Sequence, residues 1–128
     1  MSGPEIECPP ELRRAAETAL RAAGLEDGHL SIELVDSERI RELNLRFRGR
    51  DTPTDVLSFP VDERGPSAGP RELGDVVICP EHTHDLEEAV VHGVLHLAGH
   101  DHERDRGEML ALQDQVLEKL RASTGEAR

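Results

Sequence analysis

Aromatic residues are nearly missing from this chain of 128 residues, which has two phenylalanines and no tryptophan or tyrosine. Proteins that hold single-stranded nucleic acid on rows of stacked bases need several aromatic side chains on one surface. Phe47 and Phe59 cannot form such a row, so an aromatic RNA platform is excluded. The core must instead be built from leucine, valine, isoleucine and alanine.

Long hydrophobic runs and cysteines are also scarce. No apolar run approaches the roughly 18 residues of a membrane-spanning helix, and no secretory signal pattern is present at the amino terminus. Because Cys8 and Cys79 are the only cysteines, no disulfide is expected, and Cys79 fits an apolar strand better than a metal site. We therefore predict a cytoplasmic protein with no membrane contact, folded as one domain over residues 1–128.

The charge distribution is uneven. The net charge of −12 argues against RNA binding, because affinity for phosphate comes from lysine and arginine side chains. Residues 39–50, however, contain five arginines and one acid, a local balance of +4 on an otherwise acidic chain. Phosphate groups are therefore expected to bind here, and the acidic remainder would limit indiscriminate RNA binding.

These five arginines fall into two groups. Arg39 and Arg41 are predicted to lie on the solvated face of a helix and to pair with Glu38 and Glu42. The other three lead into a loop before a strand, and the planar guanidinium suits bidentate phosphate contacts. The predicted RNA-binding residues are therefore Arg46, Arg48 and Arg50.

The most informative motif is HGVLHLAGHDH at residues 92–102, an H-x3-H-x5-H array of histidines. On a helix, His92 and His96 share one face and can reach one ion. Gly99 can end that helix, so that the chain turns back and His102 approaches the same ion. Three imidazoles leave one tetrahedral position open, which is typical of catalytic zinc, although nickel or copper accept the same ligands.

The chemistry at this metal differs from that of a peptidase. The spacing matches the metzincin pattern H-E-x-x-H-x-x-G-x-x-H, but Gly93 replaces the glutamate that serves as general base. Zinc can still lower the pKa of a bound water to about 7. Asp101, His100 or Glu103 could transfer a proton, and a carboxylate there could equally orient a metal-bound imidazole. The remaining histidines are not predicted ligands: His29, His82 and His84.

Hydrophobic periodicity predicts an α+β fold. Four strands are expected, near residues 6–8, 31–35, 55–59 and 73–79. Helices are expected at 10–23, after a cap at Asp36 or Ser37, after Pro80, and at 104–122, with a surface loop at 61–71. The predicted architecture is a four-stranded mixed sheet with about five helices around it and the metal at the end of the penultimate helix. Gly93 in that helix indicates close packing against a strand or approach of substrate.

Several blocks of the sequence resemble the YbeY family of bacterial endoribonucleases. The blocks are HGVLHLAGHDH at 92–102, RFRGRDTPTDVLSFP at 46–60, LGDVVIC at 73–79, and the helix with Met109 and Gln113. They occur in the family's order and spacing. The family's fold agrees with the α+β prediction.

The resemblance implies a zinc-dependent, single-strand-specific endoribonuclease that acts in ribosomal RNA processing, including 16S rRNA 3′-end maturation, and in ribosome quality control. It implies ribosomal RNA as substrate and the small ribosomal subunit or its proteins as partners. It also implies that His92, His96 and His102 bind Zn²⁺ and that Arg48 acts in catalysis, with Asp101 as a second catalytic candidate.

Two alternatives stay open. One is a small metallopeptidase, which the histidine spacing favours and Gly93 disfavours. The other is a non-enzymatic ribosome-associated module in which zinc only supports the fold, with His100 or Asp101 as a fourth ligand.

Overall fold

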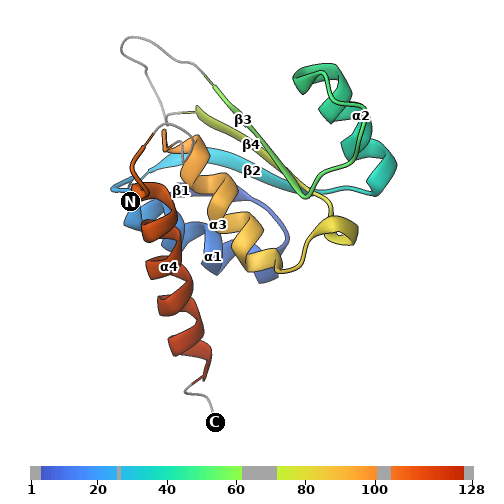
Figure 1. Cartoon of the computed structure of the whole chain (residues 1–128). Coiled ribbons are helices and arrows are strands. Elements are labelled where there is room, and N and C mark those ends of the chain that lie inside the picture. Colours follow the sequence, from blue (N-terminus) through green and yellow to red (C-terminus); the bar gives the residue numbers. More distant parts are fainter. Residues whose placement is uncertain (1–3, 26, 62–71, 101–104, 126–128) are drawn as a thin grey trace.

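The chain forms one mixed β-sheet with helices on both faces (Figure 1). The computed structural model describes residues 4–25, 27–61, 72–100 and 105–125. The elements in chain order are β1 (Pro4–Glu7), the 3₁₀ turn η1 (Pro10–Leu12), α1 (Arg13–Ala22), β2 (Gly28–Leu34), α2 (Ser37–Arg48), β3 (Val56–Pro60), β4 (Glu72–Ile78), the 3₁₀ turn η2 (Pro80–His82), α3 (Leu86–Leu97) and α4 (Glu108–Gly125). The predicted α+β class is confirmed, with four α-helices and two 3₁₀ turns in the described residues where about five helices were expected.

The strand order is β1-β2-β4-β3. The first three strands run parallel, and β3 runs antiparallel to β4. Each of the four predicted strands exists, and the strand expected near residues 6–8 is the edge strand β1. This order places β3 at the opposite edge, between α2 and α3 in Figure 1.

Side chains that alternate along β4 separate the hydrophobic core into two clusters. Val76 and Ile78 belong to a large cluster with α1, α3 and α4, on one face of the sheet. Val77 and Cys79 belong to a small cluster with Ile40 of α2, on the other face. Cys79 is fully buried there, which confirms its prediction as a core residue.

Aspartate side chains begin both helices that carry predicted site residues. Asp36 caps α2 by accepting a hydrogen bond from the Arg39 N–H at 2.8 Å, which decides between the two predicted caps. Asp85 caps α3 by accepting from the Glu88 N–H at 3.2 Å. The helix expected soon after Pro80 therefore starts only at Leu86, because η2 and this cap precede it.

Two predicted features lie partly outside the described residues. The loop expected at 61–71 is described only at its first residue. The last helix was expected at 104–122; residue 104 lies outside the described residues, and α4 begins at Glu108. No helix in the described ranges is both long and apolar enough to cross a membrane.

Candidate functional site

Two of the three predicted metal ligands lie side by side on α3. The ring centroids of His92 and His96 are 4.8 Å apart, and the rings meet edge to face at 76°. The predicted third ligand, His102, and the catalytic candidate Asp101 lie outside the described residues. Accordingly, the described part of the chain contains no group of three or more His, Cys, Asp or Glu side chains able to hold a metal.

Hydrogen bonds orient both imidazole rings through the same nitrogen. His92 Nδ1 lies 2.8 Å from Oε1 of Gln113 on α4, and His96 Nδ1 lies 3.0 Å from the carbonyl oxygen of His100. Both oxygens only accept hydrogen bonds, so each Nδ1 carries the proton and donates it. The neutral ring then has its lone pair on Nε2, which is the usual arrangement of a metal-binding histidine with an outer hydrogen-bond partner. The donor set on α3 therefore fits zinc.

Gly93 brings α3 close to the sheet. A Cβ atom at this position would lie 2.6 Å from Cγ1 of Val76 and 3.3 Å from Oγ of Ser58. The Ser58 hydroxyl donates a hydrogen bond of 3.1 Å to the Gly93 carbonyl. Close packing against strands is thus the reason for this glycine, and the metzincin glutamate has no space at this position.

Ser58 also connects the histidine helix to Arg48. Nη2 of Arg48, in the last turn of α2, donates a hydrogen bond of 2.9 Å to the Ser58 carbonyl. One residue of β3 therefore contacts Arg48 through its main chain and Gly93 through its side chain. Sequence reasoning missed Ser58, although a buried serine within the apolar run VLSF was an available signal.

The five arginines at positions 39–50 separate into two that form ion pairs and three that do not within the described residues. Arg39 pairs with Glu42 at 3.4 Å, as expected, whereas Arg41 pairs with Asp51 in the following loop instead of a neighbour on the helix. Within the described ranges, no carboxylate lies within ion-pairing distance of the other three arginines. These three are the predicted RNA-binding residues Arg46, Arg48 and Arg50.

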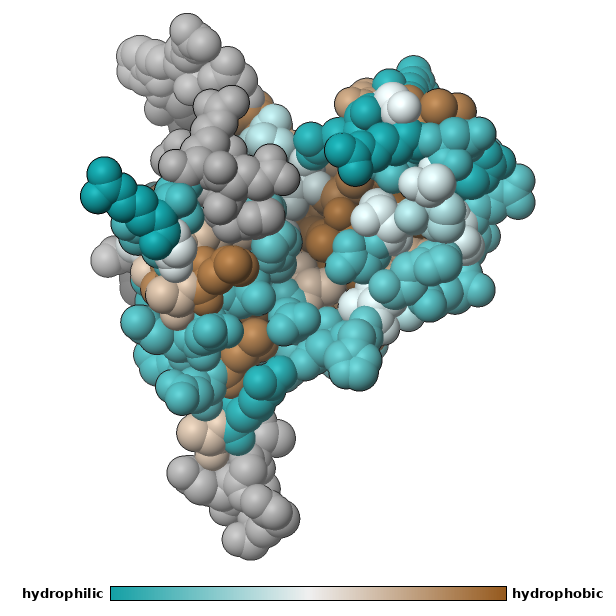
Figure 2. All heavy atoms as spheres, viewed as in Figure 1, coloured by the Kyte–Doolittle hydropathy of each residue, from teal (hydrophilic) through white to brown (hydrophobic). Residues whose placement is uncertain are grey.

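The two phenylalanines form a pair next to Arg48. The ring centroids of Phe47 and Phe59 are 5.2 Å apart at an angle of 69°, and Arg46 Cζ lies 5.4 Å from the Phe47 centroid. Phe47 is 54% exposed. Figure 2 shows a hollow with hydrophobic residues between the α2 side of the molecule and the side with α3 and α4. A row of aromatics remains excluded, but the chain does expose one aromatic ring beside cationic residues.

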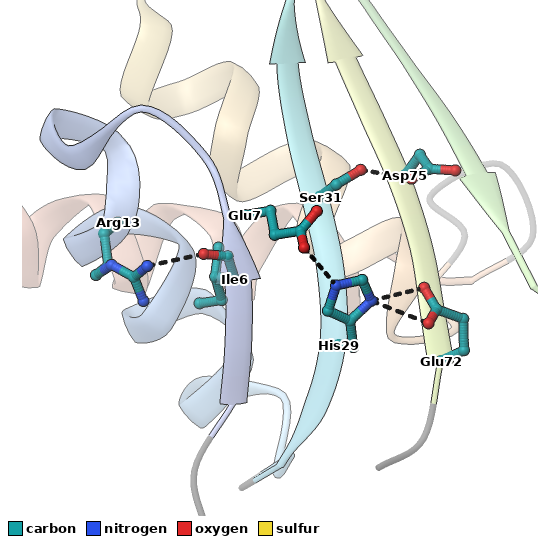
Figure 3. A network of polar contacts seen from close by, with 7 residues as sticks. All are labelled: Ile6, Glu7, Arg13, His29, Ser31, Glu72 and Asp75. Carbon is teal, nitrogen blue, oxygen red and sulfur yellow. Dashed lines mark hydrogen bonds and ion pairs between the residues drawn. The ribbon is translucent and has the colours of Figure 1, made fainter. Parts of the chain in front are cut away.

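Two of the three histidines that were excluded as ligands, His29 and His82, have other contacts. His29 on β2 lies between two carboxylates, with Nδ1 2.9 Å from Glu72 Oε1 and Nε2 3.4 Å from Glu7 Oε2 (Figure 3). The carboxylates meet different ring nitrogens, which is the geometry of an ion pair. The hydrogen bond to Glu72 raises the pKa of His29, against partial burial, which lowers it. Nε2 of His82 lies 2.8 Å from the Ser37 hydroxyl.

Comparisons with known proteins agree with this arrangement. The family model described as Endoribonuclease YbeY matches residues 5–121. The Endoribonuclease YbeY of Rubrobacter xylanophilus is 48% identical, covering 84% of this chain and 84% of the relative. The Persephonella marina protein of the same name is 39% identical over 87% of this chain and 82% of its own. The solution structure of TM1509 from Thermotoga maritima matches 95% of this chain and 93% of that one, with a TM-score of 0.59 at 28% identity.

Proposed function

Because the chain belongs to the Endoribonuclease YbeY family, we propose that it is a zinc-dependent endoribonuclease that cleaves single-stranded RNA. Family membership confirms the predicted class, a hydrolytic nuclease with RNA as its substrate. The metal, the preference for single strands and the residue roles are the proposal. The observation that carries it is the pair of imidazoles on α3, each oriented through Nδ1.

His92, His96 and His102 would hold one Zn²⁺ through imidazole nitrogens. The Gln113 and His100 hydrogen bonds support this role, because they fix the tautomer that presents Nε2 on the first two rings. When bound, zinc would activate a water molecule or polarise the scissile phosphate. Asp101 would transfer a proton or orient an imidazole of this site.

Arg48 would neutralise the charge that develops on the phosphate. A guanidinium has five N–H donors, and the bond to the Ser58 carbonyl uses one of them. That bond holds the side chain toward β3, the strand that contacts α3. A positioned cation that needs no rearrangement is the kind of group that stabilises a transition state. Arg46 and Arg50 would bind neighbouring phosphates.

We further propose ribosomal RNA as the substrate, with a role in 16S rRNA 3′-end maturation and ribosome quality control in the cytoplasm. The small ribosomal subunit or its proteins would be the partners. The −12 charge of the chain supports selective rather than general RNA binding, because the net charge repels phosphate whereas residues 39–50 carry a local balance of +4. The metallopeptidase alternative is disfavoured, because the missing glutamate would not fit at Gly93.

The proposal is tested by metal analysis of the purified protein and by cleavage of a single-stranded RNA. We expect a stoichiometric divalent transition metal, and we expect chelation or His96→Ala to abolish cleavage. Arg48→Ala should lower the cleavage rate by roughly 10²-fold, as removal of one transition-state donor does. The matched control is Arg39→Ala, because Arg39 lies on the same helix but pairs with Glu42.

Arg39→Ala should cleave at close to the wild-type rate. Cleavage that survives both chelation and His96→Ala would come from another site or a contaminating nuclease, and the proposal would be wrong. Circular dichroism of His96→Ala separates loss of the metal ligand from loss of the fold.

A further inference from the structure

The Phe47 residue is 54% exposed, and its ring contacts a second aromatic ring. It lies in the last turn of α2 and contacts Phe59 edge to face. Phe59 in turn packs against the small cluster beneath α2. The side chain therefore presents aromatic surface to the solvent while Phe59 supports the ring at one edge. A ring supported in this way loses less conformational entropy when a ligand stacks on it than a free ring would.

The surroundings of this ring carry positive charge. Arg46 lies over the ring at 5.4 Å, and Arg48 follows Phe47 directly in the sequence. The nearest acid along the chain, Asp51, is already paired with Arg41. An exposed aromatic ring with Arg46 over it, close in sequence to a second arginine that has no carboxylate partner in the described residues, complements a strand in which bases and phosphates alternate. A peptide with an apolar surface would match the ring but not the arginines.

The aromatic pair also lies next to the contacts that lead to the histidines. Phe59 is adjacent to Ser58, whose carbonyl binds Arg48 and whose hydroxyl binds the carbonyl of Gly93. Gly93 is adjacent to His92 on α3. The Phe59 side chain packs on the α2 face of the sheet and the Ser58 hydroxyl contacts α3 on the other face, as expected for neighbouring residues of a strand. Because β3 is an edge strand, RNA that reaches the proposed metal ligands can pass around this edge toward the end of α2, along the side of the molecule that is hollowed in Figure 2.

We propose that Phe47 is a stacking position for one base of the single-stranded substrate, with Arg46 and Arg48 binding the phosphates beside it. This inference rests on the proposed endoribonuclease function and adds a substrate-binding residue to it. Stacking on one phenyl ring is compatible with every base, because every base has a π-face. The position therefore favours unpaired over paired RNA without selecting a sequence.

The absence of tryptophan from the chain makes the test direct, because Phe47→Trp introduces a single fluorescent reporter at the position. The probe is a short single-stranded RNA, intact or with one abasic residue at successive positions. We expect RNA binding to quench the fluorescence of Phe47→Trp and its affinity to stay within about threefold of wild type. Phe47→Leu, which keeps an apolar side chain but removes the π-face, should weaken binding by roughly tenfold or more.

Two controls define the effect. Leu45→Ala removes a comparably exposed side chain of the same helix, 47% exposed, and should bind RNA as the wild type does. For wild-type protein, one abasic position should weaken binding as much as Phe47→Leu does. Phe47→Leu should bind the abasic RNA and the intact RNA equally well. This variant has already lost the stacking contact, so removal of the base causes no further loss.

Two negative results have different meanings. If wild-type protein binds and cleaves RNA while Phe47→Leu binds equally well and Phe47→Trp is not quenched, stacking is wrong and the proposed function stands. If wild-type protein neither binds nor cleaves RNA, the proposed function itself is wrong. If Phe47→Leu lowers the melting temperature, its weaker binding could reflect loss of the fold. The quenching of Phe47→Trp and the abasic RNA series with wild-type protein then decide whether a base stacks on this position.

Discussion

The two helices that carry the proposed site residues are attached to the sheet in different ways. Both have twelve residues, but α3 buries seven of them and α2 buries only two, Ile40 and Asn44. Helix α3 belongs to a cluster of 21 buried residues, whereas the cluster beneath α2 has four. The proposed metal ligands His92 and His96 thus lie on an element fixed by the core, and the candidate RNA contacts of α2 lie on an element held at a few points.

This difference matches the needs of the two kinds of ligand. A metal site loses affinity when its ligands shift by a few tenths of an ångström, so it benefits from a rigid element. Single-stranded RNA is flexible and adapts to the surface that binds it. Helix α2 is instead held by individual hydrogen bonds, such as that from Asn44 Nδ2 to the Thr52 carbonyl at 2.8 Å and that from Arg48 to Ser58.

The largest effect should come from a charged side chain placed where α3 meets the sheet. Gly93→Glu restores the metzincin pattern, but its Cβ would overlap Val76, and its carboxylate would be buried. Overpacking together with an unpaired buried charge should reduce the free energy of unfolding by about 3 kcal/mol or more. Denaturant unfolding monitored by circular dichroism measures this loss.

The matched change on the other helix is Leu45→Glu, at a position that is 47% exposed. A surface substitution of this kind should alter stability by no more than about 0.5 kcal/mol. Equal tolerance at both positions would show that the two helices are not attached as differently as the packing indicates. Peptidase activity in a folded Gly93→Glu protein would revive the metallopeptidase hypothesis.

Local sequence patterns predicted the parts of the fold that depend on local physics. Alternating apolar residues predicted the strand at 31–35, and apolar runs bounded by proline and glycine predicted those at 55–59 and 73–79. A polar residue before an apolar-periodic run predicted the start of α2 at Asp36 or Ser37, and Asp36 is the cap. The i, i+4 spacing of His92 and His96 predicted two rings on one helix face, and their centroids are 4.8 Å apart. Predictions of this kind depend only on the number of residues per helical turn or on the alternation of side chains along a strand.

Contacts between distant segments were not predictable in this way. Phe47 and Phe59 are separated by the loop that ends α2, and nothing in either segment alone indicates that their rings meet. Arg41 forms an ion pair with Asp51 in that loop because the chain turns back after Gly49, which has a φ of 73°. Ser58 contacts both α2 and α3 because the strand order places β3 at the edge of the sheet. Such contacts depend on topology, which hydrophobic periodicity does not determine.

A smaller effect should follow from removing the two aspartate caps, and it sharpens the comparison of the helices. Asp36→Ala and Asp85→Ala should each reduce the free energy of unfolding by about 1 kcal/mol. The reduction should be larger for Asp85, because its carboxylate also accepts a hydrogen bond of 2.7 Å from Arg121 on α4. Asp36→Ala should weaken RNA binding as well, since fewer contacts hold α2. Urea unfolding and RNA titration of both variants measure these effects.

Acid should remove the larger contribution that Asp85 makes to the free energy of unfolding. Partial burial raises the pKa of this carboxyl, but hydrogen bonds from the Glu88 N–H and from Arg121 outweigh burial, and the net pKa is lowered. Its stabilising contribution is therefore present above the unfolded pKa and is lost as the pH falls through the folded value. Asp85→Asn keeps a capping oxygen without the charge. If it behaves as Asp85→Ala at neutral pH, the charge and not the cap supplies the stabilisation.

The smallest change in stability is expected from substitution of His29, which forms ion pairs on the sheet (Figure 3). Hydrogen bonding to Glu72 raises the pKa of His29 above its ordinary 6.5, with partial burial opposing and Glu7 adding to the rise. The stabilisation is thus present below the unfolded pKa and is lost as the pH rises through the folded value. His29→Gln should reduce the free energy of unfolding at about pH 5.5 and change it little at about pH 8.5. His84→Gln, at an exposed position on another segment, is the control. An equal loss at both pH values would mean that His29 joins β1, β2 and β4 by packing, and that its charge contributes nothing.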